Sequence, residues 1–264
     1  MSRFRASFQG ERLALRGLPS EAAGELAFHL CLDGLSPGTD PAGRVLDLSG
    51  ALSSADEDPL PALLLEAVHG LAAVLADRFL FLHGCAFGFE GKAALFCGPS
   101  GAGKTTLAMV AEHLGFPALG EDLVVVDWER GWVHGLAMPF RPRPFTRELL
   151  DRWYRDRGGS WARDAPVRPG STEGTYPLER LFLAGAGKAP AVEALLACAF
   201  GRAHLDPAVL VRRAATALKG CTVHRCPQVR IAPGTSEARM KKVMDQWLRR
   251  PQDPWPTELF GIGS

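Results

Sequence analysis

Hydrophobic and polar positions form short apolar runs in the first half of the chain and helical spacings elsewhere. The first 50 residues predict short strands and turns, and an acidic segment at residues 53–59 leads into an apolar helix over residues 60–77. Helical spacing recurs over residues 105–114 and after Asp206-Pro207, a pair that suits an N-cap and a first turn. A last helix has an apolar face made of Met240, Val243, Met244, Trp247 and Leu248.

The middle of the chain predicts two β-hairpins. An apolar run over residues 79–88, a tight turn at residues 89–92 and a second run at residues 93–97 predict antiparallel neighbours. A strand at residues 123–127 is followed by a Glu-Arg-Gly turn and a returning strand at residues 132–136. A doubly wound domain would continue that strand into a crossover helix, so the second hairpin favours a mixed sheet over a purely parallel one.

Length and composition allow one large α/β domain or two small ones. With 264 residues, of which 47% are hydrophobic, the chain can bury a sizeable core. We expect a single α/β domain over residues 1–264, in which residues 1–78 supply strands and a helix. Residues 79–250 form its main core, and residues 251–264 form an extended tail.

The charge balance and the cysteines limit the partners and the location. Lys and Arg number 30 and Asp and Glu 29, so the formal net charge of +1 gives no field that attracts nucleic acid or an anionic membrane. We find no export signal or membrane-spanning run, and the six cysteines lie scattered in mostly apolar segments, as reduced thiols do. We therefore expect a cytoplasmic protein with neither kind of partner, and a homo-oligomer stays open.

The most informative segment is a glycine-rich loop between a predicted strand and a predicted helix. It matches the pattern G-x-x-x-x-G-K-[ST] with Gly98, Pro99, Ser100, Gly101, Ala102, Gly103, Lys104 and Thr105. Glycines let such a loop wrap a phosphate chain, so that backbone N–H groups and the helix N-terminus point at it. We expect Lys104 near the β and γ phosphates, Thr105 on Mg²⁺, and Thr106 among the nucleotide contacts.

Phosphoryl transfer also needs a carboxylate that holds Mg²⁺ or orients the acceptor hydroxyl. Asp127 ends an apolar strand and fits the usual rule for phosphate-loop proteins, but the second hairpin puts it at the far turn. Glu121 and Asp122 follow a short strand at residues 116–119 and so lie at the near end. We expect this pair to hold the metal and take the proton, the alternative being a solvated acidic turn.

A histidine and two arginines have open assignments. His83 precedes a glycine in the run that pairs with the loop's strand, and it is either a packed histidine or a catalytic, phosphate-contacting group. Arg141 and Arg143 lie in a basic, proline-stiffened stretch at residues 139–145. Each can clamp a phosphate or an acidic acceptor, or be a surface arginine.

The order of these features resembles the HPr kinase/phosphorylase-like proteins, whose core is similar to that of ATP-dependent phosphoenolpyruvate carboxykinase. The matching segments are His83-Gly84, residues 98–105 and residues 121–124, and the likeness covers residues 79–145, with a weaker echo to residue 248. The resemblance implies a phosphate-loop core of that type, ATP and Mg²⁺ as cofactors, and phosphorylation of a serine hydroxyl. It assigns phosphate contact to Lys104 and Mg²⁺ to Thr105, and it matches Glu121 and Asp122 to the family's acidic pair and His83 to its pre-loop histidine.

The chain departs from this family in two places. The acidic pair is usually two aspartates, whereas its first member here is Glu121, and we find no counterpart of the glycine-rich segment that true HPr kinases use in phosphorolysis and HPr docking. We therefore expect neither phosphorolysis nor HPr as the substrate. The expected function is an ATP- and Mg²⁺-dependent kinase of a serine-type hydroxyl in a peptide or protein, as in shorter relatives that tailor precursor peptides. A kinase of a small hydroxyl compound and a non-catalytic nucleotide-binding regulatory protein are the alternatives.

Overall fold

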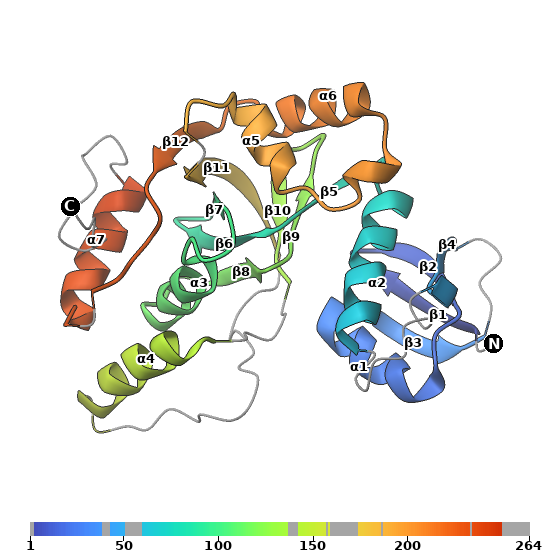
Figure 1. Ribbon diagram of the computed structural model, residues 1–264, viewed down its shortest axis with the longest axis horizontal. Helices are drawn as coiled ribbons and strands as arrows, with labels where there is room; N and C mark the ends of the chain where they lie inside the picture. The colour runs from blue at the N-terminus through green and yellow to red at the C-terminus, as the bar shows by residue number, and fades with distance from the viewer. Residues whose placement is uncertain are drawn as a thin grey trace.

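The computed structural model describes residues 3–38, 43–50, 60–136, 142–156, 158, 174–185, 187–232 and 234–249. In these ranges a four-stranded sheet and an eight-stranded sheet carry helices on their faces (Figure 1). No helix in the described ranges is both long enough and apolar enough to cross a bilayer. The predicted tail at residues 251–264 and the candidate Arg141 lie outside the described residues.

The smaller sheet is built from the N-terminal strands, in the order β3-β1-β2-β4. Two helices, α1 (Ser20–Leu30) and α2 (Leu60–Val74), pack beside it (Figure 1). The sequence did not predict α1, although Ala23, Leu26 and Leu30 are buried with helical spacing, because a short apolar run is ambiguous between strand and helix. The strands are β1 (Arg3–Phe8), β2 (Glu11–Arg16), β3 (Asp33–Pro37) and β4 (Arg44–Asp47).

The larger sheet is mixed, as the two hairpins predicted. Its order is β5-β9-β10-β11-β7-β6-β8, with β12 paired to β11. Parallel pairing joins β7, β11 and β12, and the other pairs are antiparallel. The strands are β5 (Phe79–Leu82), β6 (Gly84–Phe89), β7 (Lys92–Cys97), β8 (Ala118–Glu121), β9 (Val124–Asp127), β10 (Trp132–His134), β11 (Thr175–Ala184) and β12 (Thr222–Cys226).

Two predicted strand boundaries were wrong, and both errors concern the site. The apolar run at residues 79–88 is not one strand, because the backbone N–H of His83 donates to the carbonyl of Cys198 at 2.7 Å and leaves the ladder. The strand before His83 pairs with β9, and the strand after it pairs with β7 and β8. The short strand near residue 119 continues to Glu121, since Glu121 pairs with Cys85 of β6.

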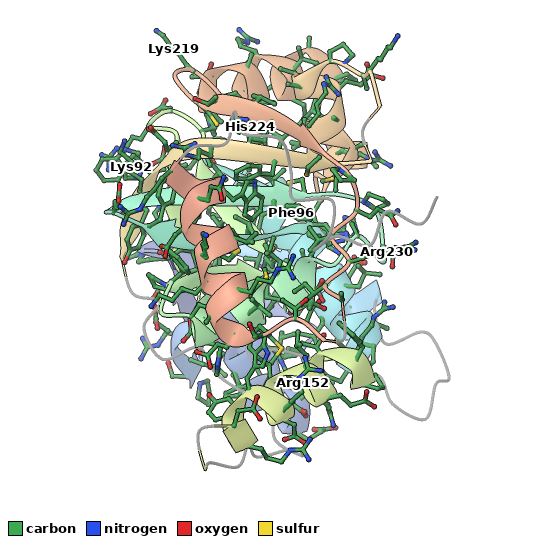
Figure 2. The ribbon with its side chains drawn as sticks, turned by 90° about the vertical axis from the view of Figure 1, so that its left-hand side faces the viewer. Lys92, Phe96, Arg152, Lys219, His224 and Arg230 are labelled. Atoms are coloured by element: carbon green, nitrogen blue, oxygen red, sulfur yellow. The ribbon has the colours of Figure 1, made fainter. Side chains whose placement is uncertain are left out.

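Helices cover both faces of the larger sheet. On one face, α3 (Lys104–His113), α4 (Pro144–Asp156) and α7 (Glu237–Arg249) enclose an aromatic core, and on the other lie α5 (Ala191–Ala197) and α6 (Pro207–Ala217). The predicted apolar face of α7 is buried, and its Trp247 ring lies 4.1 Å from that of Phe182. Figure 2 shows Phe96 beside α7, and its ring is 6.4 Å from that of Trp247. The Asp206 side chain caps α6 as predicted.

One hydrophobic cluster joins the two sheets. It combines side chains of α1, α2 and the smaller sheet with side chains of β5 and β9. The Phe8 and Phe81 rings stack at a centroid distance of 5.7 Å, and the Gln9 amide oxygen lies 3.0 Å from Nδ1 of His134. The N-terminal strands therefore share a core with the larger sheet and support β5, which leads to His83.

Candidate functional site

The glycine-rich loop at residues 98–105 has a conformation that favours glycine at two positions. Gly101 and Gly103 have φ angles of 81° and 92°, in the left-handed region that side chains disfavour. A Cβ on Gly103 would also lie 2.6 Å from the carbonyl oxygen of Val229. Gly103 is the N-cap of α3, and no side chain of the described residues caps this helix end. The N-terminal N–H groups of α3 are therefore available to an anion.

Lys104 lies inside this loop. Its side chain is buried, and Nζ donates to the carbonyls of Gly98 at 3.0 Å and Pro99 at 3.1 Å. These two bonds hold the ammonium group across the mouth of the loop, between the end of β7 and the start of α3. A positive charge is thus fixed where a phosphate chain would lie.

Thr105 and Glu121 contact each other directly. The Thr105 hydroxyl donates to Oε1 of Glu121, a buried residue that ends β8. The contact joins two segments separated by a helix and a turn, and it places a carboxylate beside the hydroxyl expected to hold Mg²⁺. The extra length of glutamate spans the gap from β8 to α3.

Asp122 follows in a strained turn and faces His83. Its φ angle of 59° is left-handed, a conformation that aspartate tolerates better than most residues. The turn is closed by a bond from the N–H of Leu123 to the carbonyl of Glu121 at 2.7 Å. The Asp122 side chain is 56% exposed, and its Oδ1 lies 3.4 Å from Nε2 of His83.

Asp127 lies at the opposite end of β9. Its Oδ1 accepts from the N–H groups of Glu129 at 3.1 Å and Arg130 at 3.0 Å, so the carboxylate closes the β9–β10 turn. The structure therefore gives Asp127 a role in the hairpin, remote from the loop end of the strand.

Replacing Asp127 with alanine should destabilise the fold without affecting nucleotide binding. The loss of two hydrogen bonds to a buried carboxylate should lower the free energy of unfolding by about 1–3 kcal/mol. Chemical denaturation measures this change, and titration with a fluorescent ATP analogue at several Mg²⁺ concentrations measures binding. Unchanged stability with a loss of Mg²⁺-dependent binding would move the metal carboxylate from the Glu121-Asp122 pair to Asp127.

A cavity of about 520 Å³ opens beside the loop, and we call it the loop cavity. Basic groups dominate its charged side chains: Lys104, Arg143 and Arg230 face one carboxylate, that of Asp122, with His83 also present. This balance favours a polyanionic ligand. Its lining comprises His83, Ser100, Gly101, Gly103, Lys104, Thr105, Thr106, Asp122, Arg143, Phe145, Thr146, Val229, Arg230 and Ile231.

The structure adds cavity residues that the sequence did not indicate. Phe145 is 38% exposed at the start of α4, and Thr146 is held against Thr106 by a bond of 2.7 Å between their hydroxyls. Arg230 lies on the segment between β12 and α7 (Figure 2), which is tied to the loop by a bond from the N–H of Val229 to the carbonyl of Ala102 at 3.0 Å. A proline before Phe145 was the one usable signal, since proline suits a first helical turn. For Arg230 no sequence signal exists.

The donor set fits a Mg²⁺ ion that arrives with a nucleotide. Within the described residues, no three His, Cys, Asp or Glu side chains cluster as a metal-binding group. Mg²⁺ is commonly held by one or two carboxylates together with phosphate and water oxygens, and a hydroxyl and two neighbouring carboxylates meet that need. Thr105, Glu121 and Asp122 are the residues that would hold it.

Comparison of the sequence with protein-family models and with curated proteins gives no match.

Proposed function

We propose that this protein is an ATP- and Mg²⁺-dependent kinase that transfers the γ-phosphoryl group to a serine-type hydroxyl of a peptide or protein. The observation that carries the proposal is the convergence of three segments on the loop cavity. Lys104 and Thr105 come from the loop, the Glu121-Asp122 pair from the end of β8, and His83 from the break between β5 and β6. A structural glycine-rich turn would need none of these contacts.

Each residue has a distinct part in the proposed reaction. The loop N–H groups, the N-terminus of α3 and Lys104 would bind the phosphates and stabilise the charge that develops on them. Bound Mg²⁺ would neutralise phosphate oxygens. Glu121 fixes the Thr105 hydroxyl through their hydrogen bond. Phe145 offers an exposed aromatic face for a base.

Asp122 is the residue proposed to receive the acceptor proton. Its carboxylate lines the loop cavity, whereas the Glu121 carboxylate is engaged by Thr105. A general base must reach the hydroxyl that it deprotonates, so the more exposed of the two carboxylates suits this role. His83 lies at 3.4 Å from Asp122 and would orient it.

The likeness to HPr kinase/phosphorylase-like proteins supports the same reading. The likeness rests on three segments that are separate in the chain: His83-Gly84, residues 98–105 and residues 121–124. These segments include several residues that line the loop cavity, together with Glu121, which contacts the cavity residue Thr105. We infer a phosphate-loop core of that type on a mixed sheet, and we expect the protein to act in the cytoplasm.

Intact-mass measurement of candidate acceptors tests the proposal. The protein is incubated with ATP, Mg²⁺ and either a serine-containing peptide mixture or a set of small hydroxyl compounds, beside the Asp122→Ala variant. A gain of one phosphate on a peptide, in the wild-type reaction alone, is the expected result. Phosphate on a small compound would change the acceptor class. Equal background ADP release by both proteins would favour a non-catalytic nucleotide binder.

A further inference from the structure

A second cavity, of about 670 Å³, lies on the other side of the phosphate loop, and we call it the α5 cavity. The end of β7 and the first loop residues border it on one side, and the segment from α5 to residue 203 borders it on the other. His83 lines both cavities. The polar and charged groups that face it are His69, His83, Cys97, Glu193, Cys198 and Arg202.

Two of these groups are cysteines in contact with each other. Cys97 ends β7 directly before Gly98, and Cys198 is the C-cap of α5. The two thiols share a hydrogen bond, and the backbone of Gly98 adds another to Cys198. The carbonyl of Cys198 also accepts from the N–H of His83 at 2.7 Å. The pair therefore connects the start of the phosphate loop to the strand break at His83.

The pKa values of the two thiols are shifted in opposite directions. The hydrogen bond from Cys97, opposed by burial and aided by the charges of His83 and Lys104, lowers the pKa of Cys198 to about 6. The same hydrogen bond, together with burial, raises the pKa of Cys97 well above its usual value. Cys198 is therefore the more acidic of the two thiols. Cys221 differs, because burial raises its pKa to about 12 although it is as partly exposed as Cys198.

We propose that Cys97 and Cys198 form a thiol oxidation site in the α5 cavity, at which a hydroperoxide closes a disulfide that weakens nucleotide binding at the loop. The cavity gives a small oxidant access to Cys198, and the contact between the sulfurs supplies the resolving thiol. The effect on the nucleotide rests on the proposed function, whereas formation of the disulfide does not.

The chemistry needs only the two cysteines and the peroxide. The Cys198 thiolate attacks one peroxide oxygen, so that an S–O bond forms as the O–O bond breaks. Sulfur loses two electrons, and the second peroxide oxygen leaves as hydroxide or alkoxide, which takes up a proton to become water or an alcohol. The Cys97 sulfur then attacks the Cys198 sulfenic acid, an S–S bond forms as the S–O bond breaks, and water leaves with the Cys97 proton. A thiol reductant reverses the reaction.

Closing this bond must shift the start of the loop or the end of α5. Sulfurs in hydrogen-bond contact have to approach to about 2.05 Å, which displaces Cys97 or Cys198. Gly98 has little room to absorb the shift, since a Cβ placed there would lie 2.9 Å from Cβ of Ala184 and 3.0 Å from Cβ of Ala102. The carbonyl of Gly98 also holds Lys104 at 3.0 Å. A shift of Cys97 on oxidation would therefore reach Lys104, the lysine proposed to bind the phosphates.

Peptide mapping and nucleotide titration test the proposal together. The full chain is treated with hydrogen peroxide, alkylated, digested and mapped by mass spectrometry, and matched samples are titrated with a fluorescent ATP analogue. We expect a Cys97–Cys198 cross-link, with Cys221 still alkylated. We also expect affinity for the analogue to fall by about tenfold or more and to return after dithiothreitol. The Cys198→Ser variant should bind the analogue with wild-type affinity, and peroxide should not change that affinity. The Cys221→Ser variant should lose affinity on peroxide treatment as the wild type does.

The outcomes separate this site from the proposed kinase. Absence of the cross-link would overturn the oxidation site, and a cross-link that leaves affinity unchanged would overturn its effect on nucleotide binding. Failure of the reduced wild-type protein to bind the analogue would overturn the proposed function. In that case the peptide map alone would show whether Cys97 and Cys198 form the disulfide.

Discussion

Replacing Lys104 with alanine should abolish detectable phosphoryl transfer, a loss of about 10³-fold or more. The ammonium group is buried in the loop and held by the Gly98 and Pro99 carbonyls, so no neighbouring cation can take its place without rebuilding the loop. The measurement is the rate of phosphate incorporation into the acceptor identified by intact mass, at saturating Mg²⁺.

Lys92→Ala is the matched control. Lys92 begins β7, the strand that leads into the loop, and its Nζ pairs with Glu179 at 3.0 Å on the protein surface. Its loss should therefore leave transfer unchanged. Thermal unfolding of the Lys104→Ala protein should show an intact fold, since the substitution removes one side chain from a cavity wall. A Lys104→Ala protein that still transfers phosphate would contradict the phosphate-binding role of the loop.

Asp122→Asn should lower the rate of transfer by about 10²–10⁴-fold while affinity for the nucleotide changes little. Asparagine keeps the size of the side chain and tolerates the left-handed φ of 59°, so the turn between β8 and β9 should survive. What is lost is the negative charge beside His83 and the ability to take a proton. Single-turnover transfer and fluorescent-nucleotide titration separate the two effects.

The Asp127→Ala protein serves as the control for this variant. In the wild type the Asp127 carboxylate closes the β9–β10 turn, away from the loop. The Asp127→Ala variant should therefore still transfer phosphate despite its lower stability. Wild-type rates in Asp122→Asn would remove Asp122 from the chemistry. Loss of nucleotide binding and of transfer in equal measure would instead assign Asp122 to holding Mg²⁺ alone, without a part in the proton transfer.

Local patterns predicted much of the fold correctly. Both hairpins are present because tight turns force their flanking strands together, whichever protein surrounds them. The local sequence also predicted the loop between β7 and α3 and the capped start of α6. Errors arose where a distant segment intervened: Cys198 draws His83 out of the ladder, and Cys85 extends β8 to Glu121.

By itself, the sequence determined the strand, loop and helix around residues 98–105, and it placed Glu121 and Asp122, rather than Asp127, at the end of the second hairpin nearer the loop. These follow from glycine placement, apolar periodicity and hairpin geometry, which act over a few residues. Only the tertiary structure decided that Glu121 engages Thr105 and Asp122 faces His83. It also decided that Phe145 and Arg230 complete the loop cavity and that Cys97 touches Cys198. Each of these contacts joins residues far apart in the chain, and packing around the shared sheet sets their distances.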